Sequence, residues 1–280
     1  MPPVVDLVDA TGWRHRLEGP PRRVISLVPS TTETVFVIGG DDRLEGITRF
    51  CVHPKRARDL LPVIGGTKSP NLELILSLGP DLVLANQEEN RREDVLALRE
   101  NVPVFVFYPR DVPAAIRDVR NLGRLLGRDR AAEELASEIE RRRPTLRAEP
   151  FRYIYLIWKR PYMAVGRDTF VDALLSEAGG VNAAPSRGRY PEMTIEELES
   201  SSADVILLST EPFPFTEEHG TELLSQFQDP DRFRDRILVV DGQLLSWHGA
   251  RLVEGLPYAA KLAASISELI TSGGQAPKNR

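Results

Sequence analysis

Apolar and polar residues follow two rhythms along this chain, and the change between them marks the segments. Residues 4–17 alternate apolar and polar side chains around a Thr11-Gly12 turn, which is typical of a β-hairpin. From residue 24 onward, short continuous apolar runs alternate with segments whose apolar residues recur at helical spacing. Strands that alternate with helices indicate a parallel sheet covered on both faces.

The elements fall into two series. In the first, apolar runs predict strands at 24–28, 45–50, 81–85 and 104–107. Between them, helical spacing predicts helices at 31–40, 71–78 and 91–100. In the second series, the predicted strands are 152–158, 204–209 and 237–241. Its predicted helices are 168–180, 194–201 and 250–271.

Residues 113–143, between the two series, are almost wholly helical in pattern, with a break only near Gly127. Residues 129–143 carry acids early and bases late, as the helix dipole prefers, and Pro144 should stop or kink the helix. We therefore predict an α/β protein of two Rossmann-like lobes with parallel sheets, joined by a single long backbone helix. The predicted parts are an N-terminal lobe (1–112, with its hairpin at 4–17), a connecting helical backbone (113–148), a C-terminal lobe (149–272) and a disordered tail (273–280).

A repeat supports two related lobes. The segment "NLELILSLGPDLVLA" aligns with "TIEELESSSADVILLS" at a constant offset of 123 residues, which pairs Glu73 with Glu196 and Asp81 with Asp204. One such match can arise simply because strand–helix–strand units resemble one another. The fixed register with identical Glu, Ser and Asp favours related lobes.

Composition narrows the classes of function. The chain has 280 residues, 41% of them hydrophobic and 28% charged, which is normal for a soluble globular protein. Its net charge of −5 argues against nucleic-acid binding, and no apolar run is long enough for a membrane-spanning helix. One cysteine excludes an intrachain disulfide. The N-terminus lacks the features of a signal peptide, so we expect either a cytoplasmic protein or a mature form.

The enzyme motifs are absent. The chain has no G-x-S-x-G, G-x-G-x-x-G or H-E-x-x-H sequence, and "GGTKS" at 65–69 lacks the glycine that a phosphate loop places before its lysine. A two-domain α/β enzyme acting on a phosphorylated or nucleotide substrate is therefore the less favoured interpretation. We expect a binding protein with no intrinsic cofactor.

The candidate ligand-binding residues lie beyond the carboxyl ends of the predicted strands, where open parallel sheets bind ligands. If the two lobes face each other, both sets of loops surround one cleft. Aromatic residues there suit stacking and basic residues suit anionic groups, although any one of them alone could simply be core or surface. The predicted ligand-binding residues are Phe50, Cys51, His53, Thr67, Lys68, Asn86, Gln87, Trp158, Arg160, Tyr162, Tyr190, Glu211, Trp247, His248 and Arg251.

Metal chemistry has a weaker basis. Cys51 has no C-x-x-C partner, so we interpret it as a small apolar filler in a loop at the rim of the cleft. His53 or His248 could supply an axial ligand to a bound metal. An alternative hypothesis is a direct metal-ion receptor that uses Cys51, His53, Glu211 and His248.

The segments "RVISLVPSTTETVFVIGG", "GGTKSPNLELILSLGPDLVLANQEEN" and "RDTFVDALLSEAGGVN" resemble class III periplasmic substrate-binding proteins of ABC importers. These helical-backbone receptors carry cobalamin, iron–siderophore complexes or haem, and the resemblance is strongest to the cobalamin-binding branch. It implies a two-lobed clamp that holds a metal chelate in its cleft and delivers it to a membrane permease. In this family one glutamate on each lobe docks onto permease arginines, and Glu73 and Glu196 match those positions.

The resemblance has departures. Phe50 and Trp247 match aromatic positions of cobalamin receptors, but Thr67 and Asn86 stand where the family often has tryptophan, which leaves other chelates open. First-turn glutamates also favour the helix dipole without any docking role. The resemblance implies a monomer in the periplasm or at the cell surface. Without a leader, a cytoplasmic carrier of corrinoids or metal chelates is the alternative.

Overall fold

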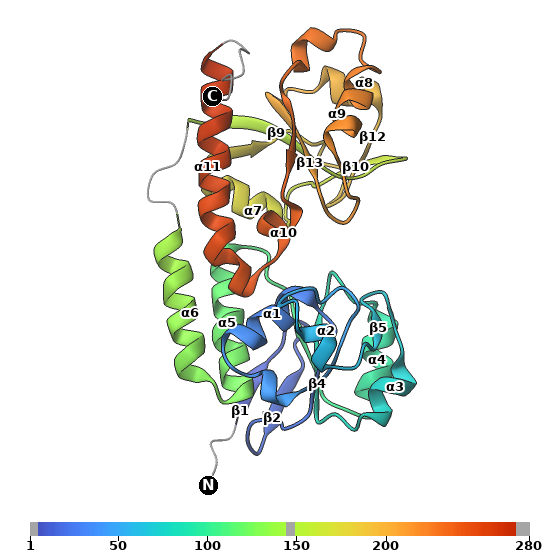
Figure 1. The fold of residues 1–280 in the computed structure, drawn as a ribbon, viewed down its shortest axis with the longest axis vertical. Coiled ribbons are helices and arrows are strands. Elements are labelled where there is room, and N and C mark those ends of the chain that lie inside the picture. The colour runs from blue at the N-terminus through green and yellow to red at the C-terminus, as the bar shows by residue number, and fades with distance from the viewer. Residues whose placement is uncertain (1–4, 144–148, 273–280) are drawn as a thin grey trace. The chain divides into compact units, whose positions relative to one another are not determined.

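A computed structural model describes residues 5–143 and 149–272, which fold into two compact units (Figure 1). Unit 1 holds the chain up to Pro109, Pro113–Arg141 and His248–Arg251. Unit 2 holds Arg110–Val112, Arg142–Trp247 and the chain from Leu252 onward. The cleft expected between the lobes stays a prediction. The expected disordered tail (273–280) and the stop at Pro144 lie outside the described residues.

Unit 1 is a parallel sheet with helices around it. Its strands are β1 (Val5–Val8), β2 (Arg14–Leu17), β3 (Val24–Ser26), β4 (Leu44–Ile47), β5 (Gly65–Gly66), β6 (Ser69–Pro70), β7 (Leu82–Asn86) and β8 (Val104–Phe107). Its helices are α1 (Pro29–Val37), η1 (Asp41–Arg43), α2 (Ala57–Leu60), α3 (Leu72–Ser77), α4 (Arg92–Arg99), α5 (Val112–Leu126), α6 (Asp129–Arg142) and η3 (Gly249–Arg251). The first residue of α5 and the last of α6 belong to unit 2.

The central sheet of unit 1 has the order β4-β3-β7-β8, and every pair in it is parallel. All five residues of β7 and all four of β8 are buried, which explains why these strands appear in the sequence as continuous apolar runs. Ile25, Ile75, Val83 and Val104 form part of the core between sheet and helices. The predicted hairpin is also present, since β1 pairs antiparallel with β2.

One buried carboxylate fastens this hairpin to the sheet. Asp9 accepts hydrogen bonds from Thr11, from His15 Nε2 at 3.2 Å, from Arg99 Nη2 at 2.5 Å and from the backbone N–H of Val106 in β8 at 3.2 Å. Burial raises the pKa of Asp9, but the hydrogen bonds from His15, Thr11 and the backbone outweigh it and lower the pKa to about 2. The ionised form of Asp9 therefore stabilises the fold.

Unit 2 repeats the strand–helix alternation. Its strands are β9 (Phe151–Trp158), β10 (Tyr162–Ala164), β11 (Gly180–Asn182), β12 (Glu192–Met193), β13 (Val205–Ser209) and β14 (Ile237–Val240). Its helices are α7 (Phe170–Glu177), α8 (Ile195–Ser200), α9 (Glu217–Leu224), η2 (Pro230–Phe233), α10 (Gly242–Ser246) and α11 (Leu252–Thr271). Over the described residues, none of the helices combines the length and the apolar character that a membrane crossing requires.

The sheet of unit 2 is mixed rather than purely parallel. Its order is β12-β10-β9-β13-β14, with β11 also paired to β9. Strands β9, β11, β13 and β14 are parallel, but β10 runs antiparallel to β9 and to β12. The sequence predicted parallel sheets and did not predict the antiparallel pairing of β10 with β9 and β12. The connection from Trp158 to Tyr162 is too short for a crossover, so it can join only antiparallel strands.

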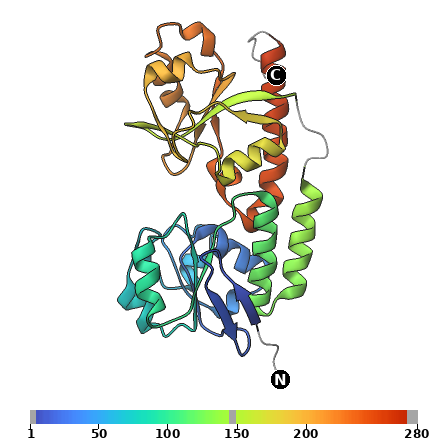
Figure 2. The same cartoon turned by 180° about the vertical axis from the view of Figure 1, so that it is seen from behind.

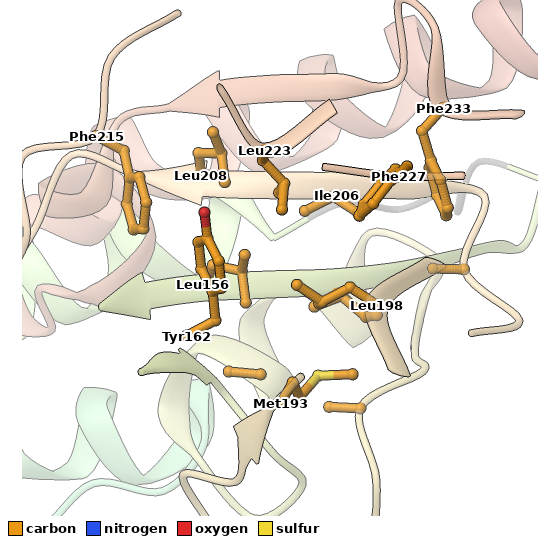
Figure 3. Close-up of a cluster of buried hydrophobic side chains, with 14 residues drawn as sticks. Leu156, Tyr162, Met193, Leu198, Ile206, Leu208, Phe215, Leu223, Phe227 and Phe233 are labelled. Atoms are coloured by element: carbon orange, nitrogen blue, oxygen red, sulfur yellow. The ribbon is translucent and has the colours of Figure 1, made fainter. Parts of the chain in front are cut away.

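A cluster of buried side chains between the sheet and α8 and α9 forms one core of unit 2 (Figure 3). Leu156 of β9 and Leu208 of β13 lie in it, and Phe215 closes one end. Tyr162 also points into this cluster, and its buried hydroxyl has no hydrogen-bond partner among the described residues. Tyr162 therefore packs as a core residue, where a ligand-binding role was predicted.

The connecting segment is helical with a break at Gly127, as predicted, so it consists of two helices rather than one continuous helix. These helices, α5 and α6, lie side by side within unit 1 (Figure 2). Gly127 has a φ of 62°, a left-handed conformation that ends α5 at little cost for glycine. Arg120 of α5 binds Glu133 of α6 at 2.8 Å across the helix pair.

The 123-residue repeat extends to the bounds of the elements. Helix α3 (72–77) maps onto α8 (195–200), and β7 (82–86) maps onto β13 (205–209). The aspartate before each strand makes the same bonds. The backbone N–H of Asp81 donates to Arg23 O and that of Asp204 donates to Arg152 O, while each carboxylate accepts the N–H of the same arginine. These shared details support two related units.

Because the pKa of Asp9 is lowered, its stabilisation is present above about pH 4 and is lost as the pH falls toward about 2. We predict that Asp9→Asn lowers the free energy of unfolding at pH 7 by about 2 kcal/mol. The variant should also lose less stability than the unaltered protein as the pH falls from about 4 to about 2. Urea unfolding between pH 2 and pH 7 measures both effects. An equal loss of unfolding free energy at low pH in the two proteins would contradict the lowered pKa of Asp9.

Candidate ligand-binding site

The carboxyl ends of the parallel strands in unit 1 carry loops that offer an aromatic surface and cations. Phe50 follows β4 and is 47% exposed, a large fraction for a phenyl ring. The guanidinium of Arg49 lies 4.9 Å from the centre of that ring. A ring and a cation side by side can receive a flat ligand with anionic substituents.

The loop after β7 is fixed against the β5–β6 hairpin. Asn90 donates from Nδ2 to Thr67 O at 3.0 Å, and its Oδ1 accepts the backbone N–H of Asn86 at 2.8 Å. Lys68 Nζ donates to Glu88 O at 2.6 Å. Thr67 and Lys68 of the hairpin are thus brought to the loop that contains Asn86 and the exposed Gln87. These four predicted residues therefore lie in one region of unit 1.

Cys51 is in the interior instead. Its thiol is fully buried and lies 3.1 Å from Thr32 Oγ1 and 3.3 Å from Thr48 Oγ1. Burial raises the pKa of the Cys51 thiol, more than the hydrogen bonds from these threonines lower it. The thiol is neutral at pH 7, which agrees with the interpretation of Cys51 as a filler. His53 lies partly buried on the same loop.

His248 and Arg251 are bound to helix α1. His248 Nε2 lies 3.3 Å from Ser30 Oγ and 3.3 Å from Asn86 Nδ2, and burial lowers the pKa of His248 to about 4. The imidazole is therefore neutral. Arg251 makes a two-point ion pair with Glu33, with an Nε–Oε2 distance of 3.1 Å and an Nη2–Oε1 distance of 2.5 Å. The guanidinium predicted for ligand anions is thus already paired.

A small cavity lies beside His248 within unit 1. It is lined by Thr31, Thr34, Phe107, Ala115, Asp118, Val119, Leu122, His248 and Gly249. Asp118 of α5 is its acidic group, and burial raises the pKa of Asp118 to about 7, although the nearby Arg117 lowers it. Since burial disfavours the carboxylate, the acid keeps its proton into the neutral range.

In unit 2 an exposed aromatic residue, Trp158, lies at the carboxyl end of β9. It is 44% exposed and packs edge-on against Phe213, with 5.8 Å between ring centres. The adjacent Lys159 pairs with Glu222 of α9, and Arg160 approaches the same carboxylate at 3.5 Å. Trp158 and Arg160 therefore lie together at this edge, and their role in ligand binding stays a prediction.

Glu211 organises a second group in unit 2. Its carboxylate accepts hydrogen bonds from Trp247 Nε1 at 3.0 Å and from Gln243 Nε2 at 2.7 Å. Trp247 is largely buried in this arrangement. Tyr190 is 38% exposed, and the guanidinium of Arg189 lies 5.7 Å from its ring centre.

The hypothesis of a direct metal-ion receptor gains no support from the geometry. Across residues 5–143 and 149–272, no three His, Cys, Asp or Glu side chains gather where they could hold an ion. The thiol of Cys51 is buried, and Glu211 is engaged by two N–H donors. A single axial contact from His53 or His248 to a bound chelate stays a prediction.

Ser30, Asn90 and Phe213 lie in segments that follow predicted strands, where ligand contacts were expected. Ser30 and Asn90 hold the loops of unit 1, and Phe213 packs against Trp158 in unit 2. His219, which contacts Phe213, was missed. His219 carried no signal, because its contact with Phe213 depends on how α9 packs.

Comparison with known proteins decides the family. A family described as "Periplasmic binding protein" matches residues 24–235. The chain belongs to the periplasmic binding protein family. The resemblance seen in the sequence is therefore confirmed. Membership also confirms the prediction of a binding protein rather than an enzyme.

Relatives of this periplasmic binding protein cover most of its length. It is 24% identical over 276 residues to the ABC transporter substrate-binding lipoprotein YvrC of Bacillus subtilis, across 94% of this chain and 85% of YvrC. It is 26% identical over 208 residues to the vitamin B12-binding protein of Vibrio cholerae, across 72% of each chain. The haem-binding protein RhuT of Roseiflexus sp. RS-1 has a TM-score of 0.73 and 25% identity, across 91% of this chain and 99% of RhuT.

The raised pKa of Asp118 makes stability fall with rising pH, whereas the lowered pKa of Asp9 makes stability fall with falling pH. The folded state keeps its proton up to about pH 7, while the unfolded state loses it near pH 4, so stability falls as the pH rises through this window. We predict that Asp118→Asn removes this decline and raises the free energy of unfolding at pH 8 by up to about 4 kcal/mol. Thermal unfolding at pH 5 and pH 8 tests it, with the exposed Asp59→Asn as control. A decline that persists in Asp118→Asn would refute the assignment.

Proposed function

We propose that this protein binds a metal chelate, either a corrinoid such as cobalamin or an iron chelate such as haem or a ferric siderophore. The bound chelate is then delivered to the permease of an ABC importer. The observation that carries this proposal is similarity over most of the chain to substrate-binding proteins whose names specify vitamin B12 and haem. The protein acts as a monomer in the periplasm or at the cell surface, and the chelate is cargo rather than a cofactor.

The chemistry of the exposed loops supports a flat ligand with charged or polar substituents. Phe50 with Arg49 and Trp158 with Arg160 each combine an exposed ring with a nearby cation. Corrins and porphyrins offer a conjugated face for stacking and peripheral amide or carboxylate groups for hydrogen bonds. The loops are held by hydrogen bonds within each unit, so little ordering is needed on binding.

We propose that Glu73 and Glu196 dock the loaded protein onto the permease. Both are exposed in the first turn of their helices, α3 and α8. Hydrogen bonds from its own backbone and from Thr194 lower the pKa of Glu196, so it is ionised at pH 7. The neighbouring Glu197 is instead paired with Arg187 at 2.6 Å. Exposed carboxylates at matched positions suit arginines on a partner.

The ligand proposal predicts that the tryptophan fluorescence is quenched when cyanocobalamin or haemin is titrated into the protein. Trp158→Ala should weaken the affinity about five- to tenfold, because it removes a stacked aromatic surface. The matched control is Trp13→Ala, since Trp13 is 56% exposed on the β1–β2 hairpin, away from the strand ends. If neither chelate binds, or if both variants weaken binding equally, the proposal fails.

The docking proposal predicts that the double variant Glu73→Arg with Glu196→Arg abolishes uptake through the cognate importer, because it reverses both charges. The chelate affinity should stay within about twofold, since neither residue lies at a strand end. The control reverses two other exposed glutamates, Glu100 and Glu218. Normal uptake by the double variant would rule out docking through these residues.

A further inference from the structure

Four rings form a connected group in unit 2, and only one of them, Trp158, belongs to the proposed ligand site. Trp158 contacts Phe213, and Phe213 lies 4.7 Å from Phe215 and 5.2 Å from His219 between ring centres. His219 also contacts Phe215 at 5.8 Å. The pairs that involve His219 or Trp158 are edge-to-face, with interplanar angles of 75° to 88°. This is a favourable arrangement of aromatic rings.

A hydrogen bond and two ring contacts hold the imidazole of His219 in place. Its Nδ1 accepts the backbone N–H of Thr216 at 3.0 Å and lies 2.9 Å from Thr216 Oγ1, so that it caps the N-terminus of α9. Its ring also packs against Phe213 and Phe215. Because Nδ1 accepts a hydrogen bond, the ring cannot rotate without breaking the cap.

Helix α9 also fixes the turn that follows Trp158. Its Glu222 pairs with Lys159 and lies near Arg160. The backbone N–H of Phe213 donates to Ile157 O at 3.3 Å, directly before Trp158. Residues of α9 thus contact both the turn after Trp158, through Glu222, and the ring of Phe213 that packs against Trp158, through His219.

We propose that His219 is a positioning residue for ligand binding: it orients Trp158 through Phe213 and does not touch the ligand. The inference rests on the proposed function, in which Trp158 stacks on the chelate. Phe213 contacts both Trp158 and His219, so loss of the imidazole removes one of the ring contacts that hold Phe213 against Trp158, while its contact with Phe215 remains. A half-exposed indole without this support would sample more rotamers, and stacking on it would cost more entropy.

The test labels all three tryptophans with 5-fluorotryptophan and records ¹⁹F NMR spectra of the ligand-free protein. The signal of Trp158 is assigned by its loss in Trp158→Phe. We expect His219→Ala to shift and broaden this signal and to leave that of Trp13 unchanged. The affinity for cyanocobalamin or haemin, whichever binds, should fall about three- to tenfold.

Three further variants separate positioning from helix capping. His219→Gln can keep the cap but loses the ring, so it should disturb Trp158 as His219→Ala does. His219→Phe keeps a ring and should restore the signal of Trp158. In a Phe213→Leu background, His219→Ala should have no further effect on Trp158. The exposed Glu218→Ala in the same helical turn is the control and should change nothing.

A fall in melting temperature for His219→Ala with an unchanged Trp158 signal would overturn the proposal, because His219 would then only cap α9. Effects of His219→Ala that persist without Phe213 would overturn it as well. If neither chelate binds the unaltered protein, the proposed function fails. The ¹⁹F signal of the ligand-free protein still decides whether His219 positions Trp158.

Discussion

The parallel hydrogen-bond ladder is the constraint on which the rest of the structure depends. In unit 1, β3 pairs with β4 and β7, and β7 with β8, all in the same direction. Parallel pairing forces the carboxyl ends of the strands to one edge, so the loops that follow them must gather there. Phe50 follows β4 and Asn86 ends β7, so both lie at this edge for this reason, and the Asn90 hydrogen bond brings Thr67 of the β5–β6 hairpin to it. In unit 2 the parallel ladder of β9, β13 and β14 places Trp158 and Glu211 at an edge in the same way.

Both units then fix their loops with hydrogen bonds and ion pairs made by polar side chains of the same unit. In unit 1, Asn90 and Lys68 tie the hairpin to the loop after β7, and Glu33 holds Arg251. In unit 2, Glu211 holds Trp247 and Gln243. Loops held in this way lose little freedom when a ligand binds, which suits a receptor that must take up and release an unchanged cargo. The chain belongs to the periplasmic binding protein family.

Much of the fold could be predicted because it depends on local periodicity. The run 104–107 is strand β8, and each of the other predicted strands and helices overlaps an observed element of the same type. Strand β10 was missed because three residues are too few to show a period. The site was harder to predict. Arg251 and His248 were assigned to the ligand, yet their partners Glu33 and Asn86 lie 218 and 162 residues away in the chain, and only tertiary packing brings them together.

The most direct test of the central claim is native mass spectrometry of the protein after incubation with an equimolar mixture of cyanocobalamin, haemin and a ferric siderophore. We predict a single added mass equal to one intact chelate, and release of that chelate unaltered when the protein is denatured. Unliganded protein throughout, or a chelate recovered in chemically changed form, would contradict the claim that this chain is a receptor that binds its cargo without converting it.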